Sequence, residues 1–193
     1  MKTTVKCIAA CFMATLLSVN TKAKTCCQTA AMQIDSMLNQ PAPDFVLKDL
    51  DGKTVSLSNF RGKTLVIDFW ATWCHYCKAS FSSAQSMIEK YKGDPDVKFL
   101  FIDTREKYPN YLELINKILN DNHYTFKVVL DEKGDDGIQN KIYKAFGCQG
   151  VPTKIIVDKK GIVRYKILGF DESLTADTEI KNVSALIDQV KRL

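Results

Sequence analysis

The chain has 193 residues, of which 46% are hydrophobic and 25% are charged. This length and composition predict one globular domain with a proper core, and they exclude repeat and low-complexity proteins. The formal net charge is +5, but three of the lysines lie in a leader segment and no basic patch is interleaved with aromatic residues. The charge therefore gives no argument for nucleic-acid binding.

Residues 1–23 have the pattern of a secretory signal peptide. A short basic start precedes an apolar run over residues 7–19, and the small residues that end at Ala23 fit a cleavage site. The run is shorter than the about 20 residues that span a bilayer. An uncleaved membrane anchor and a lipoprotein modified at Cys11 or Cys26 are the alternatives. Cleavage would release the protein into the periplasm or cell envelope, where disulfides form and persist.

The chain contains seven cysteines, a high number for a cytosolic enzyme. Two of them lie in the leader, and the other five form an odd set, which argues against a simple structural disulfide framework. Residues 24–40 are polar and weakly patterned, and we interpret them as a tether before a domain of residues 41–193. The adjacent Cys26 and Cys27 are either a second redox or metal pair or mobile thiols near the new N-terminus.

Strands and helices are predicted to alternate after residue 40. Apolar runs and turn signals predict strands at residues 44–47, 54–57, 64–69, 97–103, 127–130, 154–157 and 162–168. Helical spacing of apolar residues predicts helices after Cys77, over residues 110–118 with Asn110 as the cap, around Ile142, and from Ile180 to Val190. This order predicts an α/β fold with a mixed central sheet, helices on both faces and an extra N-terminal β-hairpin.

Cys74 and Cys77 lie where the strand at residues 64–69 gives way to a helix that begins near His75. Unpaired amide groups and the macrodipole at a helix N-terminus favour a thiolate at Cys74. Lowering the pKa of a thiol from about 8.5 to about 7 requires about 2 kcal/mol, which a favourable helix terminus supplies. A protonated His75 would lower this pKa further. We therefore predict that Cys74 attacks a disulfide and that Cys77 resolves the mixed disulfide.

With these motifs the chain resembles the thioredoxin superfamily, and most closely its exported TlpA-like thiol-disulfide oxidoreductases. The matching stretches are residues 42–45 (Ala-Pro-Asp-Phe), 51–53 (Asp-Gly-Lys), 62–63 (Gly-Lys), 68–78 around the two cysteines, 150–153 (Gly-Val-Pro-Thr) and 158–161 (Asp-x-x-Gly). The resemblance covers the chain from about residue 41 to its end. It implies a thioredoxin fold with a helical insertion near residues 108–123, and a reaction that needs no cofactor.

The resemblance also implies a cis peptide bond between Val151 and Pro152, beside the cysteines. A cis proline would leave the backbone edge at Val151 free to pair with an extended substrate, so we predict that Trp73, Val151 and Pro152 bind substrate. A plain turn proline is the alternative. Asp68 stands where thioredoxins carry a buried carboxylate, and we expect a raised pKa and proton exchange with Cys77. An ordinary strand-end aspartate with satisfied hydrogen bonds is the alternative.

The chain departs from the TlpA-like pattern at two places. Relatives in cytochrome c maturation usually carry Glu and Pro where this chain has Ser80 and Ser82, which argues against haem-protein maturation. The dipeptide His75-Tyr76 differs from the Gly-Pro of cytosolic thioredoxins and leaves the direction of exchange open. We expect a reductase whose partners are cysteine-containing exported proteins and an upstream electron donor, such as a membrane thiol-disulfide transporter.

Two other functions compete on the same fold. A thiol peroxidase of the alkyl hydroperoxide reductase type needs Pro-x-x-x-Thr-x-x-Cys, but those positions hold Ile67 and Ala71. A metal-binding module needs further ligands, whereas His123 is the only histidine besides the one between the cysteines, so we expect no metal site. Cys148, four residues before Pro152, is either a third reactive thiol or a small apolar core residue.

Overall fold

The computed structural model describes residues 33–134 and 137–193. The predicted leader and the pair Cys26 and Cys27 lie outside these residues. In the described part, eight strands form one sheet in the order β1-β8-β7-β4-β5-β6-β2-β3. The strands are β1(Gln33–Pro41), β2(Val46–Asp49), β3(Thr54–Ser56), β4(Thr64–Trp70), β5(Val97–Asp103), β6(Val128–Leu130), β7(Thr153–Val157) and β8(Ile162–Leu168).

The sheet is mixed, as predicted. Strand β4 lies at its centre, parallel to β5 and antiparallel to β7, and β5 is also parallel to β6. Hairpins are attached at both ends: β2 pairs with β3 on one side, and β7 pairs with β8 on the other. This arrangement confirms the predicted α/β fold and its extra N-terminal hairpin.

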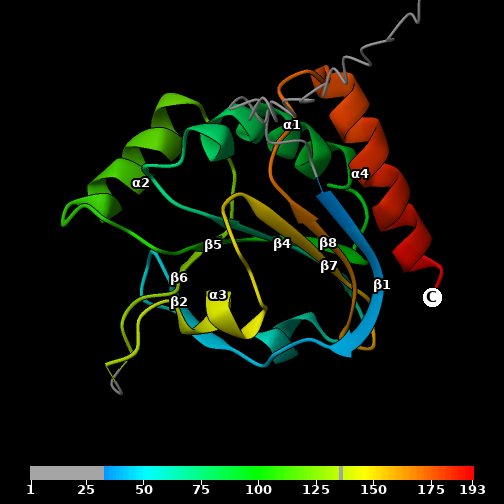
Figure 1. Cartoon of the computed structure of the whole chain (residues 1–193), viewed down its shortest axis with the longest axis horizontal. Helices are drawn as coiled ribbons and strands as arrows, with labels where there is room; N and C mark the ends of the chain where they lie inside the picture. Colours follow the sequence, from blue (N-terminus) through cyan, green and yellow to red (C-terminus); the bar gives the residue numbers. More distant parts are fainter. Residues whose placement is uncertain (1–32, 135–136) are drawn as a thin grey trace, which may run out of the picture.

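Helices cover both faces of the sheet (Figure 1). One face carries α1(His75–Lys90), α2(Tyr111–Asp121) and α4(Ala176–Lys191), and the other carries α3(Lys141–Ala145) and the short 3-10 helix η1(Leu57–Phe60). Because side chains alternate along a strand, β4 contributes to both cores: Val66 and Trp70 pack under α1 and α4, while Ile67 and Phe69 pack on the α3 side. Asp68, by the same alternation, faces the α1 and α4 side.

The N-terminal end of the described chain differs from our expectation. Residues 33–41, most of which we interpreted as the end of a tether, form β1, which pairs antiparallel with β8 and extends the sheet by one strand. Its polar residues give no strand signal, because an edge strand is held by backbone hydrogen bonds that nearly any side chain allows. The predicted boundary at residue 41 therefore does not coincide with the start of the sheet.

The helices occur where the apolar spacing predicts them, with differences at their ends. The insertion helix α2 is present, but the side chain of its N-cap residue Asn110 makes no capping hydrogen bond. Helix α3 has only 5 residues. Within the described ranges, no helix has the length and apolar character that crossing a bilayer requires.

Candidate functional site

Cys74 and Cys77 form a disulfide at the start of α1, with an S–S distance of 2.07 Å. Cys74 is the N-cap residue of this helix, and its Sγ accepts a hydrogen bond from the backbone N–H of Cys77 at 3.1 Å. Cys74 is 4% exposed and Cys77 is 0% exposed, so of the two residues only Cys74 has any contact with solvent. An anion on the Cys74 sulfur would therefore be stabilised by an amide at the helix N-terminus, where charge on a thiol is most favourable.

Two of the predicted substrate-binding residues belong to the same core region as this disulfide. Trp73 and Val151 both pack against the apolar cluster that contains the two cysteines. The Val151–Pro152 peptide bond is cis, as the resemblance implied. Across the two described ranges, the backbone N–H and C=O of Val151 make no hydrogen bond, so this edge has the groups that an added strand would need.

Asp68 lies in β4 on the face that carries α1, and it is 3% exposed. Burial raises the pKa of its carboxyl group, and the ammonium group of Lys154, 2.9 Å from Oδ2, opposes that rise. Lys154 is also buried and lies 4.0 Å from Oε1 of Glu179 in α4. The expected buried carboxylate is therefore part of a cluster that includes a cation and a second acid.

Sequence reasoning missed Lys154 and Glu179. Lys154 stands directly opposite Asp68 in the antiparallel pairing of β4 and β7. Its signal was a single charged residue inside an otherwise apolar strand, two positions after Pro152. A lysine buried in such a strand requires an anionic partner, and that requirement would have pointed to Asp68.

His75, which we predicted to lower the pKa of Cys74, has an exposed side chain. Its Nε2 lies 3.7 Å from Oε1 of Glu172, and its side chain is 80% exposed. The ring packs edge-to-face against Tyr76. Water screens a charge in such a position, so a large effect on the thiol is not expected, and the tuning role stays a prediction.

Cys148 carries a free thiol that packs against the core on the α3 side. Burial raises the pKa of this thiol to about 12. The neutral thiol is a weak nucleophile, so the structure favours the core-residue interpretation over a third reactive cysteine.

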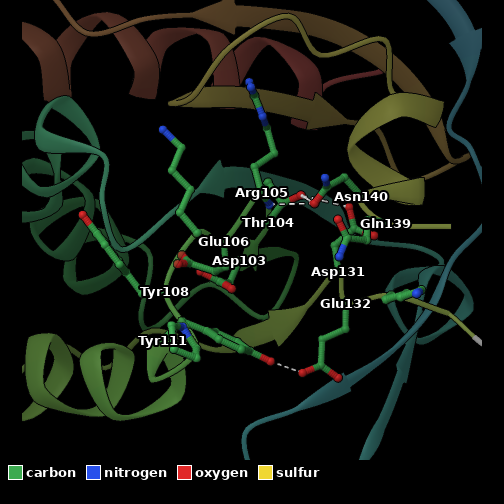
Figure 2. A pocket seen from close by; sticks show the side chains of 13 residues that line it. Asp103, Thr104, Arg105, Glu106, Tyr108, Tyr111, Asp131, Glu132, Gln139 and Asn140 are labelled. Carbon is green, nitrogen blue, oxygen red and sulfur yellow. Dashed lines mark hydrogen bonds between the residues drawn. The ribbon is translucent and has the colours of Figure 1, made fainter. Parts of the chain in front are cut away.

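A cavity of about 580 Å³ lies beside the segment that follows β5. Figure 2 shows the side chains that line it, among them Asp103, Glu106, Tyr111 and Glu132. Asp103 stands opposite Trp70 in the parallel pairing of β4 and β5, so the cavity is close to the residues that lead into Cys74. Within the described ranges, no three His, Cys, Asp or Glu residues are placed so that they could hold a metal ion.

Several known proteins that resemble this chain in sequence are named as thiol-disulfide oxidoreductases. The model of the AhpC/TSA family matches residues 38–166. The thiol-disulfide oxidoreductase ResA of Geobacillus thermodenitrificans (strain NG80-2) is 31% identical over 128 residues, which are 66% of this chain and 67% of ResA. The ResA of Bacillus thuringiensis subsp. konkukian (strain 97-27) is 27% identical over 147 residues, which are 76% of this chain and 79% of that protein.

A solved structure agrees with these relatives. The crystal structure of a thiol:disulfide interchange protein DsbE from Chlorobium tepidum superposes with a TM-score of 0.62 at 28% sequence identity. The match covers 80% of this chain and 97% of that one. The resemblance to TlpA-like proteins and the thioredoxin fold are thereby confirmed.

Proposed function

The chain belongs to the AhpC/TSA family of thioredoxin-like proteins and is a thiol-disulfide oxidoreductase, and we propose that it reduces disulfides in proteins outside the cytoplasm. One observation carries the proposal: Cys74 and Cys77 are joined at the start of α1, with the Cys74 sulfur on an amide N–H and the Cys77 sulfur buried. Such a pair accepts and donates two electrons reversibly without any cofactor.

The proposed reaction begins with the reduced pair. The Cys74 thiolate attacks one sulfur of a substrate disulfide, a mixed disulfide forms, and the other substrate sulfur leaves as a thiolate. Cys77 then loses its proton and attacks Cys74, which releases the second substrate sulfur and forms the Cys74–Cys77 disulfide. The substrate gains two electrons and the pair loses two. Asp68, with its raised pKa, is the group we assign to accept the Cys77 proton.

The substrate would approach along the edge at Val151. The unpaired N–H and C=O of this residue support the addition of an extended segment of the substrate as a short strand. Trp73, which is half-buried beside Cys74, would contact the same segment. This mode recognises backbone rather than particular side chains, and it therefore fits a protein that acts on several exported substrates.

The location and the electron source complete the proposal. The leader-like residues 1–23 support export to the periplasm or cell envelope, with a membrane tether as an alternative. In an oxidising compartment the pair would be converted to the disulfide unless electrons were supplied. The proposed donor is therefore a membrane thiol-disulfide transporter that reduces the Cys74–Cys77 disulfide after each cycle.

Insulin reduction by the purified protein tests the activity and the order of attack. Cys74→Ser should lose activity, because the attacking thiol is gone. Cys77→Ser should accumulate a mixed disulfide with insulin, since nothing resolves it. The same variant expressed in cells should trap natural substrates, which mass spectrometry would identify. Full activity of Cys74→Ser would show that the assigned nucleophile is wrong. Rapid turnover of hydrogen peroxide by the reduced protein would favour the peroxidase alternative.

The direction of exchange is tested by the reduction potential of the Cys74–Cys77 pair, measured against glutathione or dithiothreitol. A value near about −270 mV, as in thioredoxin, is expected for a reductase. A value near about −120 mV, as in a strong oxidant, would reverse the proposed direction while leaving the exchange chemistry intact.

A further inference from the structure

The segment of residues 104–107, which follows β5, lies against the turn that leads into Cys74. Both carboxylate oxygens of Glu106 accept hydrogen bonds from Thr72: Oε1 from the backbone N–H at 2.5 Å and Oε2 from the hydroxyl group at 2.7 Å. Thr72 is buried and lies two residues before Cys74. One side chain therefore holds both the backbone and the side chain of this turn.

The neighbours of Glu106 in the same segment hold Trp73, the residue next to Cys74. The indole Nε1–H of Trp73 donates a hydrogen bond to the carbonyl oxygen of Arg105 at 2.8 Å. The Nζ of Lys107 lies 3.7 Å from the centre of the Trp73 ring, where a cation is attracted by the ring electrons. Three consecutive residues of the segment thus contact the two residues before the reactive cysteine.

The segment is itself held in place from its other side. Arg105 has a φ of +58°, a left-handed conformation that a residue with a side chain keeps only where its surroundings impose it. Its backbone N–H donates to Oδ1 of Asn140 at 2.7 Å, and its Nη1 donates to the hydroxyl of Tyr143 at 3.1 Å. Glu106 is therefore presented to Thr72 by a fixed backbone.

Asp103 lies beside Glu106, whose side chain is half-buried. Asp103 is 2% exposed, and within the described residues its Oδ2 has no hydrogen-bond partner. The two carboxyl groups lie next to each other at the cavity wall (Figure 2). Burial, followed by the proximity of Glu106, raises the pKa of Asp103 to about 10, so Asp103 is protonated near neutral pH. A protonated carboxyl donates a hydrogen bond, and the Glu106 carboxylate has room to accept it beside the two from Thr72.

The other charged and titratable groups at this cavity are Arg105, Lys107, Tyr108, Tyr111, Asp131, Glu132 and Lys133. Several of these groups make hydrogen bonds to residues other than Asp103 and Glu106. Asp131 accepts hydrogen bonds from backbone N–H groups of α3, and the Tyr111 hydroxyl donates one to Glu132. Across the described ranges, none of these cations forms an ion pair with Asp103 or Glu106. Within the described ranges, no lysine or arginine side chain therefore balances the charge of this acid pair.

We propose that Glu106 is a positioning residue for disulfide exchange at Cys74, and that the buried Asp103 beside it helps to hold the Glu106 carboxylate against Thr72. Glu106 acts through Thr72, two residues before Cys74, on the placement of the attacking sulfur. The proposal rests on Cys74 as the attacking thiol. The contact with Thr72, however, is measurable without any assay of activity.

The test compares Glu106→Ala with Glu106→Gln, and uses Glu113→Ala, an exposed glutamate in α2, as the matched control. The first readout is hydrogen exchange of the Thr72 amide, and the second is kcat/KM for insulin reduction. Glu106→Ala should speed exchange of this amide and lower kcat/KM about tenfold each, as the loss of a charge-assisted hydrogen bond predicts. Glu106→Gln keeps an acceptor and should stay within about threefold of wild type, and the control should match wild type.

A second pair of variants addresses the proton on Asp103. Asp103→Asn keeps a hydrogen-bond donor without an ionisable group, whereas Asp103→Leu keeps the approximate shape and removes the donor. At pH 7 the Asp103→Asn variant should preserve slow hydrogen exchange of the Thr72 amide. In the Asp103→Leu variant this exchange should be about as fast as in Glu106→Ala. Equal behaviour of these two variants would contradict the assigned proton.

Two results would overturn the positioning role. One is a folded Glu106→Ala variant with unchanged Thr72 exchange and unchanged kcat/KM. The other is a loss of rate that follows only the folded fraction, with Thr72 no more affected than other buried amides, since that result describes general stability. Failure of the Cys74→Ser test would instead refute the assigned nucleophile, so the two proposals fail separately.

Discussion

Two buried aspartates lie at neighbouring places in the sheet, Asp68 in β4 and Asp103 at the end of β5, and they have opposite partners. Asp68 faces the ammonium group of Lys154 at 2.9 Å, whereas Asp103 faces the carboxyl group of Glu106. Burial raises the pKa of both. The cation opposes this rise at Asp68, while the second acid increases it at Asp103.

Because their neighbours differ, the two aspartates are expected to have different roles. A carboxyl group next to a cation can change its protonation at a lower free-energy cost, which suits the proton exchange with Cys77 that we propose. Asp103, next to an acid, keeps its proton near neutral pH and serves as a hydrogen-bond donor. We therefore expect the ion pair to respond most to the loss of its cation and the acid pair to respond most to pH.

The largest effect of a substitution at a single pH is expected from Lys154→Met. This change removes the cation from a buried cluster and leaves Asp68 and Glu179 without it. Loss of one partner of a buried pair typically costs about 3–5 kcal/mol, and the free energy of unfolding should fall by this amount in urea titrations.

Two further variants make this measurement specific. Asp68→Asn combined with Lys154→Met should recover part of the loss, because the orphaned acid at β4 is then neutral. Lys117→Met removes a lysine from an exposed i,i+4 pair with Asp121 and should change stability little. If the two lysine variants were equally stable, the buried ion pair between Lys154 and Asp68 would not contribute to the stability of the fold.

The next effect is a dependence of the free energy of unfolding on pH, caused by Asp103. Its pKa is about 10 in the folded protein and about 3.9 in an unfolded chain. The folded state therefore binds this proton more tightly, so the stabilisation is complete below about pH 4 and is lost as the pH rises towards 10. Within that window one such group changes the free energy of unfolding by about 1.4 kcal/mol per pH unit.

Asp103→Asn has no proton to lose and should remove this share of the pH dependence. Urea unfolding of both proteins at pH 5, 7 and 9 measures it, with wild type losing stability relative to the variant at each step. If the free energies of unfolding of the two proteins changed in parallel with pH, Asp103 would be ionised in the folded protein. The proposed difference between Asp103 and Asp68 would then be wrong.

The cysteine site and the order of elements could be predicted because their signals are local. A C-x-x-C motif between an apolar run and a helical pattern needs no knowledge of distant residues. The partners of the two aspartates could not be predicted in this way. Lys154 meets Asp68 through the register of two antiparallel strands, and Glu106 reaches Thr72 through a loop held by Asn140.

Strand β1 shows the same limit. Its residues carry no strand pattern, and their pairing depends on the free edge of β8. The charged residues of the central strands carry a more useful signal. Asp68 and Asp103 are both single acids near the ends of apolar strands, and Lys154 is a single cation in a third, so each needed a partner that the sequence could have been searched for.

A smaller effect is expected from Glu179→Gln. Glu179 is the second acid near Lys154, and its Oε2 has no hydrogen-bond partner within the described residues. With this charge removed, Lys154 interacts with Asp68 alone, so the pKa of Asp68 should fall, while stability should change by about 1 kcal/mol. Carbon-13 NMR of the carboxyl groups follows the Asp68 titration. A rise in this pKa would show that Glu179 does not compete for the cation.

The smallest effect is expected from His75→Ala. The imidazole is 80% exposed and its ion-pair partner is the exposed Glu172, whereas Asp68 and Lys154 are buried. Exposed charges are screened by water and salt, so the rate at which Cys74 reacts with a small disulfide should change less than about twofold at pH 7. Tyr76→Ala, which leaves the imidazole in place, is the matched control. If His75→Ala, but not Tyr76→Ala, greatly slowed the reaction of Cys74, an exposed side chain would control the reactivity of the thiol. Burial would then not determine which charges near Cys74 affect it.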